Sequence, residues 1–100
     1  MTQYQKVMTV LCQSPNRWFY PFDFMRPEAG DLFVGYKAGT RLAELAHDYP
    51  GMLEKRVEGK YTQYRVCKNT VGEWFNTIPK DLRQVVAKEL DYYPYRPVEG

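Results

Sequence analysis

The hydrophobic pattern changes its period at Pro50-Gly51, and this change limits the possible folds more than any other feature of the chain. In residues 37–49, apolar side chains recur at steps of four, three and four residues, which is the spacing of one face of an amphipathic helix. In residues 52–67, apolar and polar side chains alternate on both sides of a Glu58-Gly59-Lys60 turn, which is the pattern of a β-hairpin. The sequence therefore predicts an α+β fold in which a helix leads directly into a hairpin.

The rest of the chain is predicted to be mainly helical. Residues 2–13 have helical spacing, with Thr2 as the N-cap. Trp18 and Phe19 could form a short strand, ahead of a short helix at residues 21–25. Residues 73–78 form either a short helix or an extended segment, and Pro79 is predicted to be the first residue of a last helix. We expect four aromatic side chains to build the hydrophobic centre: Trp18, Phe19, Phe22 and Phe24.

The predicted order is helix, short strand, short helix, helix, hairpin and helix, which is the order of a winged helix. Five segments carry a closer resemblance: Thr40-Arg41-Leu42, Glu44-Leu45, Leu53-Glu54-Lys55-Arg56, Gly59-Lys60-Tyr61 and Tyr64-Arg65-Val66. In these segments the chain resembles the winged helix-turn-helix DNA-binding proteins of prokaryotes and their phages. The resemblance implies a winged-helix domain in residues 1–68, with a three-helix core and a two-stranded wing. Residues 69–100 are predicted from their own apolar stripe and tyrosines to add a C-terminal helix and an aromatic tail to the same domain, as an element that could serve dimerisation.

The third helix and the wing carry the candidate contacts to DNA. The N-terminal residues of a recognition helix meet base edges in the major groove, and wing cations suit phosphates. Arg41 could read guanine through its guanidinium, or it could pair with Glu44 or Asp48 across one turn. The wing cations could also serve only to keep edge strands soluble. The candidate DNA-binding residues are Lys37, Thr40, Arg41, Glu44, Lys55, Arg56, Lys60, Tyr61 and Arg65.

The net charge is modest for a DNA-binding protein. The chain carries +2, with a pI near 8.5, whereas dedicated nucleic-acid-binding domains often exceed a pI of about 9. A monomer would bind DNA weakly at physiological salt, so we expect a dimer or a larger assembly. The last helix could pack on the first helix or on its twin in a dimer. The candidate interface residues are Leu82, Val85, Val86, Leu90, Tyr92, Tyr93 and Tyr95.

Residues for catalysis or metal binding are scarce. The chain has two cysteines, Cys12 and Cys67, and one histidine, His47, and their spacing does not suit a zinc site. We expect both cysteines to be buried free thiols, with a disulfide as the alternative, and His47 to lie on a helix surface or at a helix end. The chain has no phosphate-binding glycine loop and no paired-carboxylate signature. The sequence therefore predicts no enzyme activity, no metal and no cofactor.

The N-terminal residues show neither a signal peptide nor a membrane-spanning run, so we expect a cytoplasmic protein with no membrane partner. The leading interpretation is a sequence-specific protein that binds double-stranded DNA, as a small phage or prokaryotic transcriptional regulator and a possible homodimer. The alternative is a winged-helix protein-interaction module, such as a phage-encoded inhibitor of a host protein complex. The near-balanced charge and the aromatic tail favour this alternative.

Overall fold

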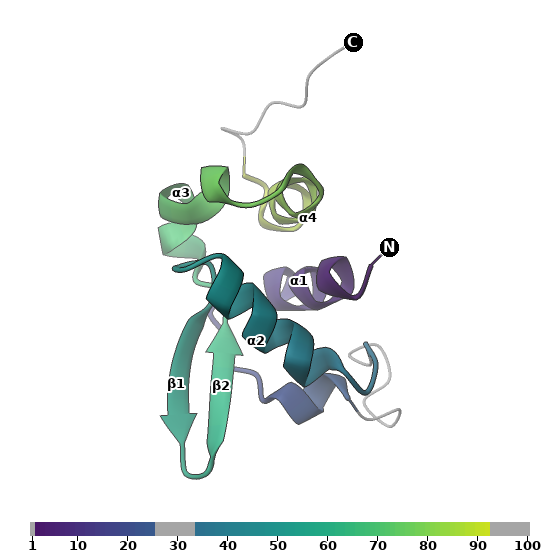
Figure 1. Ribbon diagram of the computed structural model, residues 1–100. Helices are drawn as coiled ribbons and strands as arrows, with labels where there is room; N and C mark the ends of the chain where they lie inside the picture. The colour runs from purple at the N-terminus through teal and green to yellow at the C-terminus, as the bar shows by residue number, and fades with distance from the viewer. Residues whose placement is uncertain (1, 26–33, 93–100) are drawn as a thin grey trace.

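The computed structural model describes residues 2–25 and 34–92, and within them the chain has an α+β fold (Figure 1). This part comprises four α-helices and one two-stranded antiparallel sheet. The helices are α1 (Gln3–Gln13), α2 (Ala38–Asp48), α3 (Val71–Trp74) and α4 (Lys80–Leu90), and the strands are β1 (Glu54–Glu58) and β2 (Tyr61–Arg65). Short 3-10 helices join them, namely η1 (Pro21–Phe24), η3 (Lys68–Thr70) and η4 (Phe75–Thr77).

Helix α1 begins at a complete capping box. The Thr2 hydroxyl accepts a hydrogen bond from the Gln5 N–H at 3.2 Å, and Gln5 Oε1 accepts one from the Thr2 N–H at 2.7 Å. These bonds satisfy N–H groups that the start of a helix otherwise leaves without acceptors. The predicted first helix and its N-cap are therefore confirmed.

Helix α2 and the hairpin follow the predicted change of period. Helix α2 buries three of the four residues of its predicted apolar stripe and half-buries the fourth, Tyr49. Strand β1 pairs with β2 so that Glu58 lies opposite Tyr61. Gly59 takes a φ of 64° at the first of the two turn positions, where a type II′ turn takes glycine. Both predicted elements are confirmed.

One bridge ties the segment before η1 to the hairpin. The Phe19 N–H donates to the Tyr64 carbonyl at 2.8 Å, and the Phe19 carbonyl accepts from the Tyr64 N–H at 2.9 Å. The predicted short strand is thus reduced to a single bridge, and η1 confirms the short helix that follows. Helix η1 packs closely on α2, because a Cβ at Gly39 would lie 3.3 Å from the Cβ of Pro21. Glycine in the first turn of α2 allows this approach.

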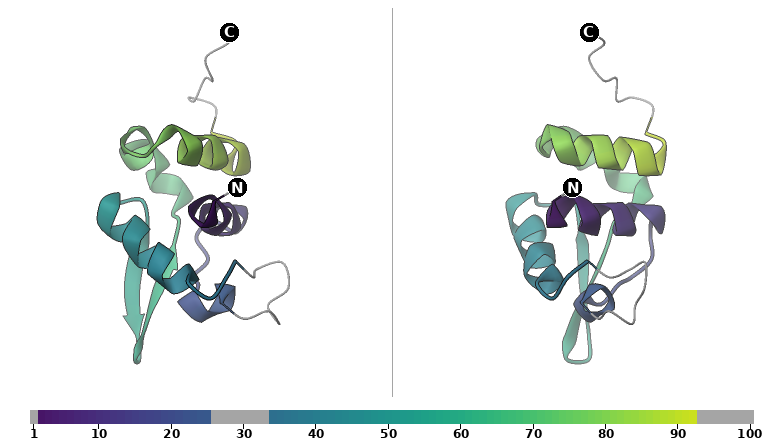
Figure 2. Two further views of the ribbon diagram at one scale, coloured as in Figure 1. Left: turned by 45° about the vertical axis from the view of Figure 1, so that its right-hand side comes forward. Right: turned by 90° about the vertical axis from the view of Figure 1, so that its right-hand side faces the viewer.

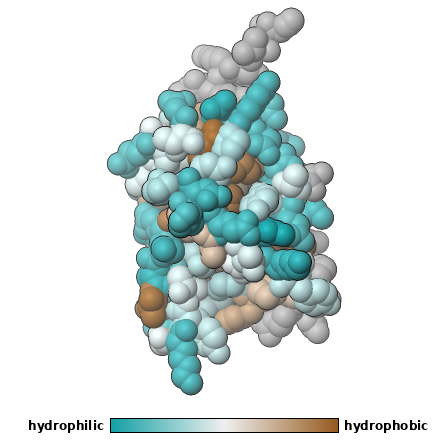
Figure 3. Space-filling view, viewed as in Figure 1, coloured by the Kyte–Doolittle hydropathy of each residue, from teal (hydrophilic) through white to brown (hydrophobic). Residues whose placement is uncertain are grey.

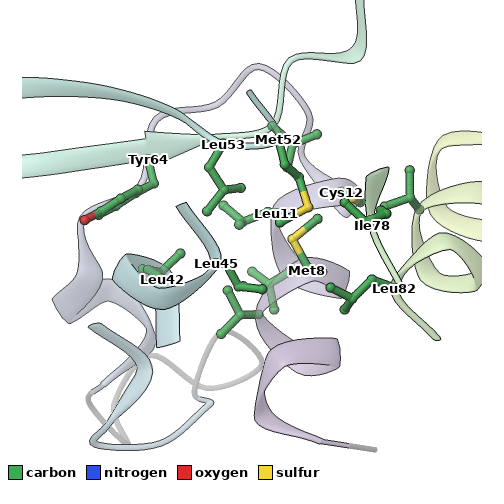
Figure 4. Close-up of a cluster of buried hydrophobic side chains, with 14 of the residues drawn as sticks. Met8, Leu11, Cys12, Leu42, Leu45, Met52, Leu53, Tyr64, Ile78 and Leu82 are labelled. Atoms are coloured by element: carbon green, nitrogen blue, oxygen red, sulfur yellow. The ribbon is translucent and has the colours of Figure 1, made fainter. Parts of the chain in front are cut away.

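Helix α1 lies at the centre of the fold. It packs against α4 on one side and α2 on the other (Figures 1 and 2). Of the four predicted core aromatics, Phe19 and Phe24 are fully buried, whereas Trp18 and Phe22 are half-buried. Figure 4 shows how α1, α2, the hairpin region and the segment entering α4 meet through Met8, Leu11, Cys12, Leu42, Leu45, Met52, Leu53, Tyr64, Ile78 and Leu82.

The C-terminal helices belong to the same core. Leu82, Val86 and Leu90 are at most 5% exposed, in the helix that packs on α1. The last helix therefore packs on the first, which is one of the two predicted alternatives, and the assignment of these three residues to a partner interface is corrected. Residues beyond 68 supply part of the same hydrophobic core as residues 1–68. Helix α4 begins at Lys80, with Pro79 as its N-cap rather than its first residue.

Candidate nucleic-acid interface

Helix α2 leaves one face open to solvent. Lys37, Thr40, Ala43 and His47 are exposed, and their steps of three, three and four residues place them on one side of the helix. We call these four residues the α2 stripe. Helix α2 lies at the surface beside the hairpin (Figures 1 and 2), and the same side of the molecule is mostly hydrophilic in Figure 3. An exposed helix of this kind has the dimensions to enter a DNA major groove.

Charge is graded along α2. Lys37 occupies the N-cap, and no side chain caps the helix start by a hydrogen bond. The Ala38 N–H donates to the Gly35 carbonyl at 3.1 Å, and the N–H groups that follow it in the first turn can face an anion. At the other end, His47 Nδ1 lies 3.2 Å from Asp48 Oδ1, and the His47 side chain is 89% exposed. The prediction that His47 lies on a helix surface is confirmed. The N-terminal end of α2 is therefore the end that suits a phosphate.

Arg41 lies outside the α2 stripe and is paired. Its guanidinium donates to Gln3 Oε1 at 3.1 Å, to Glu44 Oε1 at 2.8 Å and to the Tyr4 hydroxyl at 3.4 Å, and the side chain is 26% exposed. Glu44 also accepts a hydrogen bond from the Tyr4 hydroxyl, which raises the pKa of Tyr4 above its usual value. The structure thus shows the pairing alternative for Arg41, with added partners on α1. These contacts fix α2 against α1.

The sequence prediction omits two residues of the α2 stripe, Ala43 and His47. Helical periodicity alone could have found them, because both lie opposite the buried side of α2. They are missed because the prediction takes polar side chains near the N-terminal end of the helix, whereas exposure on a helix depends on position along its whole length.

The hairpin extends beyond the core (Figure 1). Every residue from 55 to 61 is exposed. Two cations of the predicted site, Lys55 and Lys60, form no salt bridge within the described part of the chain. Their ammonium groups are therefore available to a phosphate.

Two arginines of the hairpin stack on Trp18. The guanidinium carbons of Arg56 and Arg65 each lie 4.4 Å from the centroid of a Trp18 ring. Arg65 also donates to Glu54 Oε2, at 2.9 and 3.1 Å, so its charge is paired. Arg56 Nε donates to the buried Gln63 at 2.6 Å, while its terminal nitrogens make no hydrogen bond to the described residues. Arg56 is thus held in place with donors left for a ligand.

Tyr61, another predicted site residue, belongs to a group of three rings that we call the aromatic cluster. Tyr20 and Phe22 stack with their centroids 4.8 Å apart. Tyr61 meets both edge-on, with centroid distances of 6.1 and 5.4 Å, and remains 54% exposed. Partly exposed rings of this kind suit a contact with another molecule.

The remaining predicted interface residues are only partly described. Val85 is half-buried against the core. Tyr92 packs on Phe75, with ring centroids 4.7 Å apart, and so helps to cover the chain's own core. Tyr93 and Tyr95 lie outside the described residues. The homodimer stays a prediction.

The two cysteines have different surroundings. Both are free, as predicted. Cys12 is 1% exposed, and burial, with a smaller contribution from Glu89, raises the pKa of its thiol to about 12. Cys67 is only half-buried, which corrects the prediction that both thiols are buried.

We expect Ellman's reagent at about pH 8 to modify Cys67 in the folded protein and Cys12 only after unfolding, because the thiolate is the reactive form. The absorbance of the released thiol then reports one equivalent before guanidinium is added and two afterwards. A Cys67→Ser variant should release none until it unfolds. Two rapid equivalents from the folded wild-type protein would contradict the burial of Cys12.

Within the described residues, no helix combines the length and the apolar character that crossing a membrane requires. Among the same residues, no three His, Cys, Asp or Glu side chains gather in a way that could hold a metal ion. Comparison of the chain with protein-family models, with curated proteins and with solved structures found no match. The geometry of α2 and the hairpin therefore carries the functional inference.

Proposed function

We propose that this protein binds double-stranded DNA as a winged helix, with α2 in the major groove and the hairpin against the phosphate backbone. The observation that carries the proposal is the α2 stripe, an open helix face followed directly along the chain by a projecting hairpin. In helix-turn-helix proteins the recognition helix lies in the major groove in this way. Sequence-specific binding would make the protein a small transcriptional regulator, the function that the sequence resemblance implies.

The order of elements supports the winged-helix class. Along the chain come α1, the bridge at Phe19, η1, α2 and the two strands of the hairpin. Among the described residues α2 is therefore the third helix, and it precedes the wing, as the resemblance implies. The contact between η1 and Gly39 gives the second and third helices the close packing of a helix-turn-helix.

We place the N-terminal half of α2 nearest to the DNA. Lys37 and the first turn, which no side chain caps, lie at this end, whereas Asp48 lies at the other end. Arg41 and Glu44 neutralise each other beside the stripe. A phosphate therefore meets a cation and the positive end of the helix dipole, and it avoids the carboxylate of Asp48.

The cations of this surface set the expected affinity. On the α2 stripe and the hairpin, the cations without a carboxylate partner among the described residues are Lys37, Lys55, Arg56 and Lys60. So few phosphate contacts give weak binding. A plot of the logarithm of the binding constant against the logarithm of salt concentration falls with a slope of about 0.9 for each contact. We therefore propose that specific binding uses two copies of the chain on one DNA site.

Replacing Lys60 by alanine is expected to weaken binding to all duplexes alike, because the ammonium at the hairpin tip contacts phosphate and not bases. The salt slope should fall by about 1. Fluorescence anisotropy with labelled duplexes, from about 50 to 200 mM salt, measures both effects. Lys88→Ala, which removes the same charge from an exposed position on α4, is the matched control and should behave as wild type. Failure of the wild-type protein to bind any duplex at low salt would overturn the proposed function.

A protein-interaction module is the second candidate, and exposed apolar side chains favour it. Val57, on β1, is 73% exposed, and Tyr36, which precedes α2, is 69% exposed. The hairpin also carries Arg56, and its Tyr61 completes the aromatic cluster with two rings at η1. Aromatic residues and arginine dominate the binding energy of many protein interfaces. A stoichiometric complex with a protein of a host assembly, resistant to nuclease and formed by a chain that binds no duplex, would decide for this candidate.

A further inference from the structure

The composition of the α2 stripe indicates which bases it contacts. Resting on the proposed function, we propose that α2 reads thymine, with the methyl groups of Thr40 and Ala43 packed against the C5-methyl group of the base. In the major groove an A·T pair presents this methyl group beside its hydrogen-bonding edge. Apolar contact from alanine or from the methyl group of threonine distinguishes thymine from the other bases.

The middle of the α2 stripe offers no side chain that reads guanine or adenine through two hydrogen bonds. Arginine or lysine serves for guanine, and asparagine or glutamine for adenine. Arg41 is the only arginine in α2, and its guanidinium is held by Glu44 at 2.8 Å and by two further acceptors on α1. Lys37 lies at the N-cap of α2, at the end of the helix that we assign to a phosphate rather than to a base. Guanine readout would therefore require the contact between α1 and α2 to break.

The shape of the α2 stripe suits close approach to the base edges. Thr40 and Ala43 are exposed and one turn apart, so they cover adjacent positions on one helix face. Gly39, next to them, has no side chain and is packed on η1. Between Lys37 and His47 the stripe thus presents only methyl and hydroxyl groups. A helix with such short side chains can bring its backbone deep into the groove, to within van der Waals reach of thymine methyl groups.

The test replaces thymine by deoxyuridine, which keeps every hydrogen-bonding group of the base and lacks only the methyl group. The wild-type protein first selects a duplex from a random-sequence library, and each thymine of that duplex is then replaced singly. We expect affinity to fall about threefold to fivefold at one or two positions, the value of one buried methyl group, and to stay unchanged elsewhere. Unchanged affinity at every position overturns the inference, while the selected binding still supports the proposed function.

The variant Thr40→Ser tests whether the methyl group of Thr40 causes the preference for thymine, because serine keeps the hydroxyl group and lacks the methyl group. It should still bind the selected duplex but lose the preference for thymine over deoxyuridine at one position. Thr77→Ser, on η4, is the matched control, since Thr77 is exposed and its hydroxyl donates to the Trp74 carbonyl at 2.6 Å, as serine also can. An undiminished preference in Thr40→Ser would contradict the role of Thr40. Absence of any duplex binding by the wild-type protein would instead overturn the proposed function itself.

Discussion

A chain that ends at Lys68 is expected to be unfolded, although it still contains α1, α2 and the hairpin. The deletion removes seven buried apolar side chains: Val71, Trp74, Phe75, Ile78, Leu82, Val86 and Leu90. Burial of one such side chain contributes about 1.5–3 kcal/mol, whereas the net stability of a native domain is about 5–15 kcal/mol. The deleted residues also no longer lose conformational entropy on folding, but the remaining chain keeps the apolar surface that they covered, and a small net stability leaves little to offset it.

The deletion also uncovers α1, the helix at the centre of the core. Figure 4 shows Met8 and Cys12 of α1 beside Ile78 and Leu82, so both would face water in the shortened chain. Far-UV circular dichroism and thermal unfolding test the prediction, with a chain ending at Tyr92 as the control. The control should unfold cooperatively. Cooperative unfolding of residues 1–68 by themselves would contradict the single core and restore the boundary that the sequence suggests.

Elements with a local pattern could be predicted from the sequence. The change of period at Pro50-Gly51 places the end of α2 and the start of the hairpin, because a helix and a strand require different spacings of apolar residues. Thr2 marks the start of α1, since its hydroxyl accepts from a helix N–H three residues on. In each case the cause and its effect lie within a few residues of each other.

The packing partner of an apolar helix face could not be predicted from the local sequence pattern. The stripe on α4 is visible in the sequence, but the pattern does not say whether α1 or another molecule packs on it. The answer depends on where residues 71–78 turn the chain, and their α3 and η4 turns have no strong sequence signal. The interface predicted at Leu82, Val86 and Leu90 is wrong for this reason.

In the candidate site, too, features set by local sequence could be predicted and features set by tertiary packing could not. Exposure of Lys37 and Thr40 follows from helix geometry and could be predicted. The pairing of Arg41 could be predicted only for Glu44, because the other acceptors, Gln3 and Tyr4, lie on α1 and are distant along the chain. Side chains at the border of a helix face take their role from tertiary neighbours, which a helical pattern does not specify.

Replacing Ala43 by glutamate is expected to abolish duplex binding and to leave the fold intact. Ala43 is exposed in the middle of the α2 stripe, so the new carboxylate would lie against phosphates and base acceptors. Placing like charges against each other at an interface costs several kcal/mol, and each 1.4 kcal/mol corresponds to about a tenfold change in affinity. The affinity should therefore fall by about 100-fold or more. Glutamate is a good helix former, so the unfolding temperature should stay close to that of the wild type.

Gln84→Glu is the matched control for Ala43→Glu. Gln84 is exposed on α4, and its replacement changes the net charge by the same unit at a position outside the α2 stripe and the hairpin. Anisotropy titrations at one low salt concentration should show near wild-type affinity for Gln84→Glu and no saturable binding for Ala43→Glu. Equal weakening by the two variants would mean that net charge alone drives binding, and it would contradict the placement of α2 in the groove. The two variants have the same net charge, so a difference in their affinity for the duplex can come only from direct contact between the α2 stripe and the DNA.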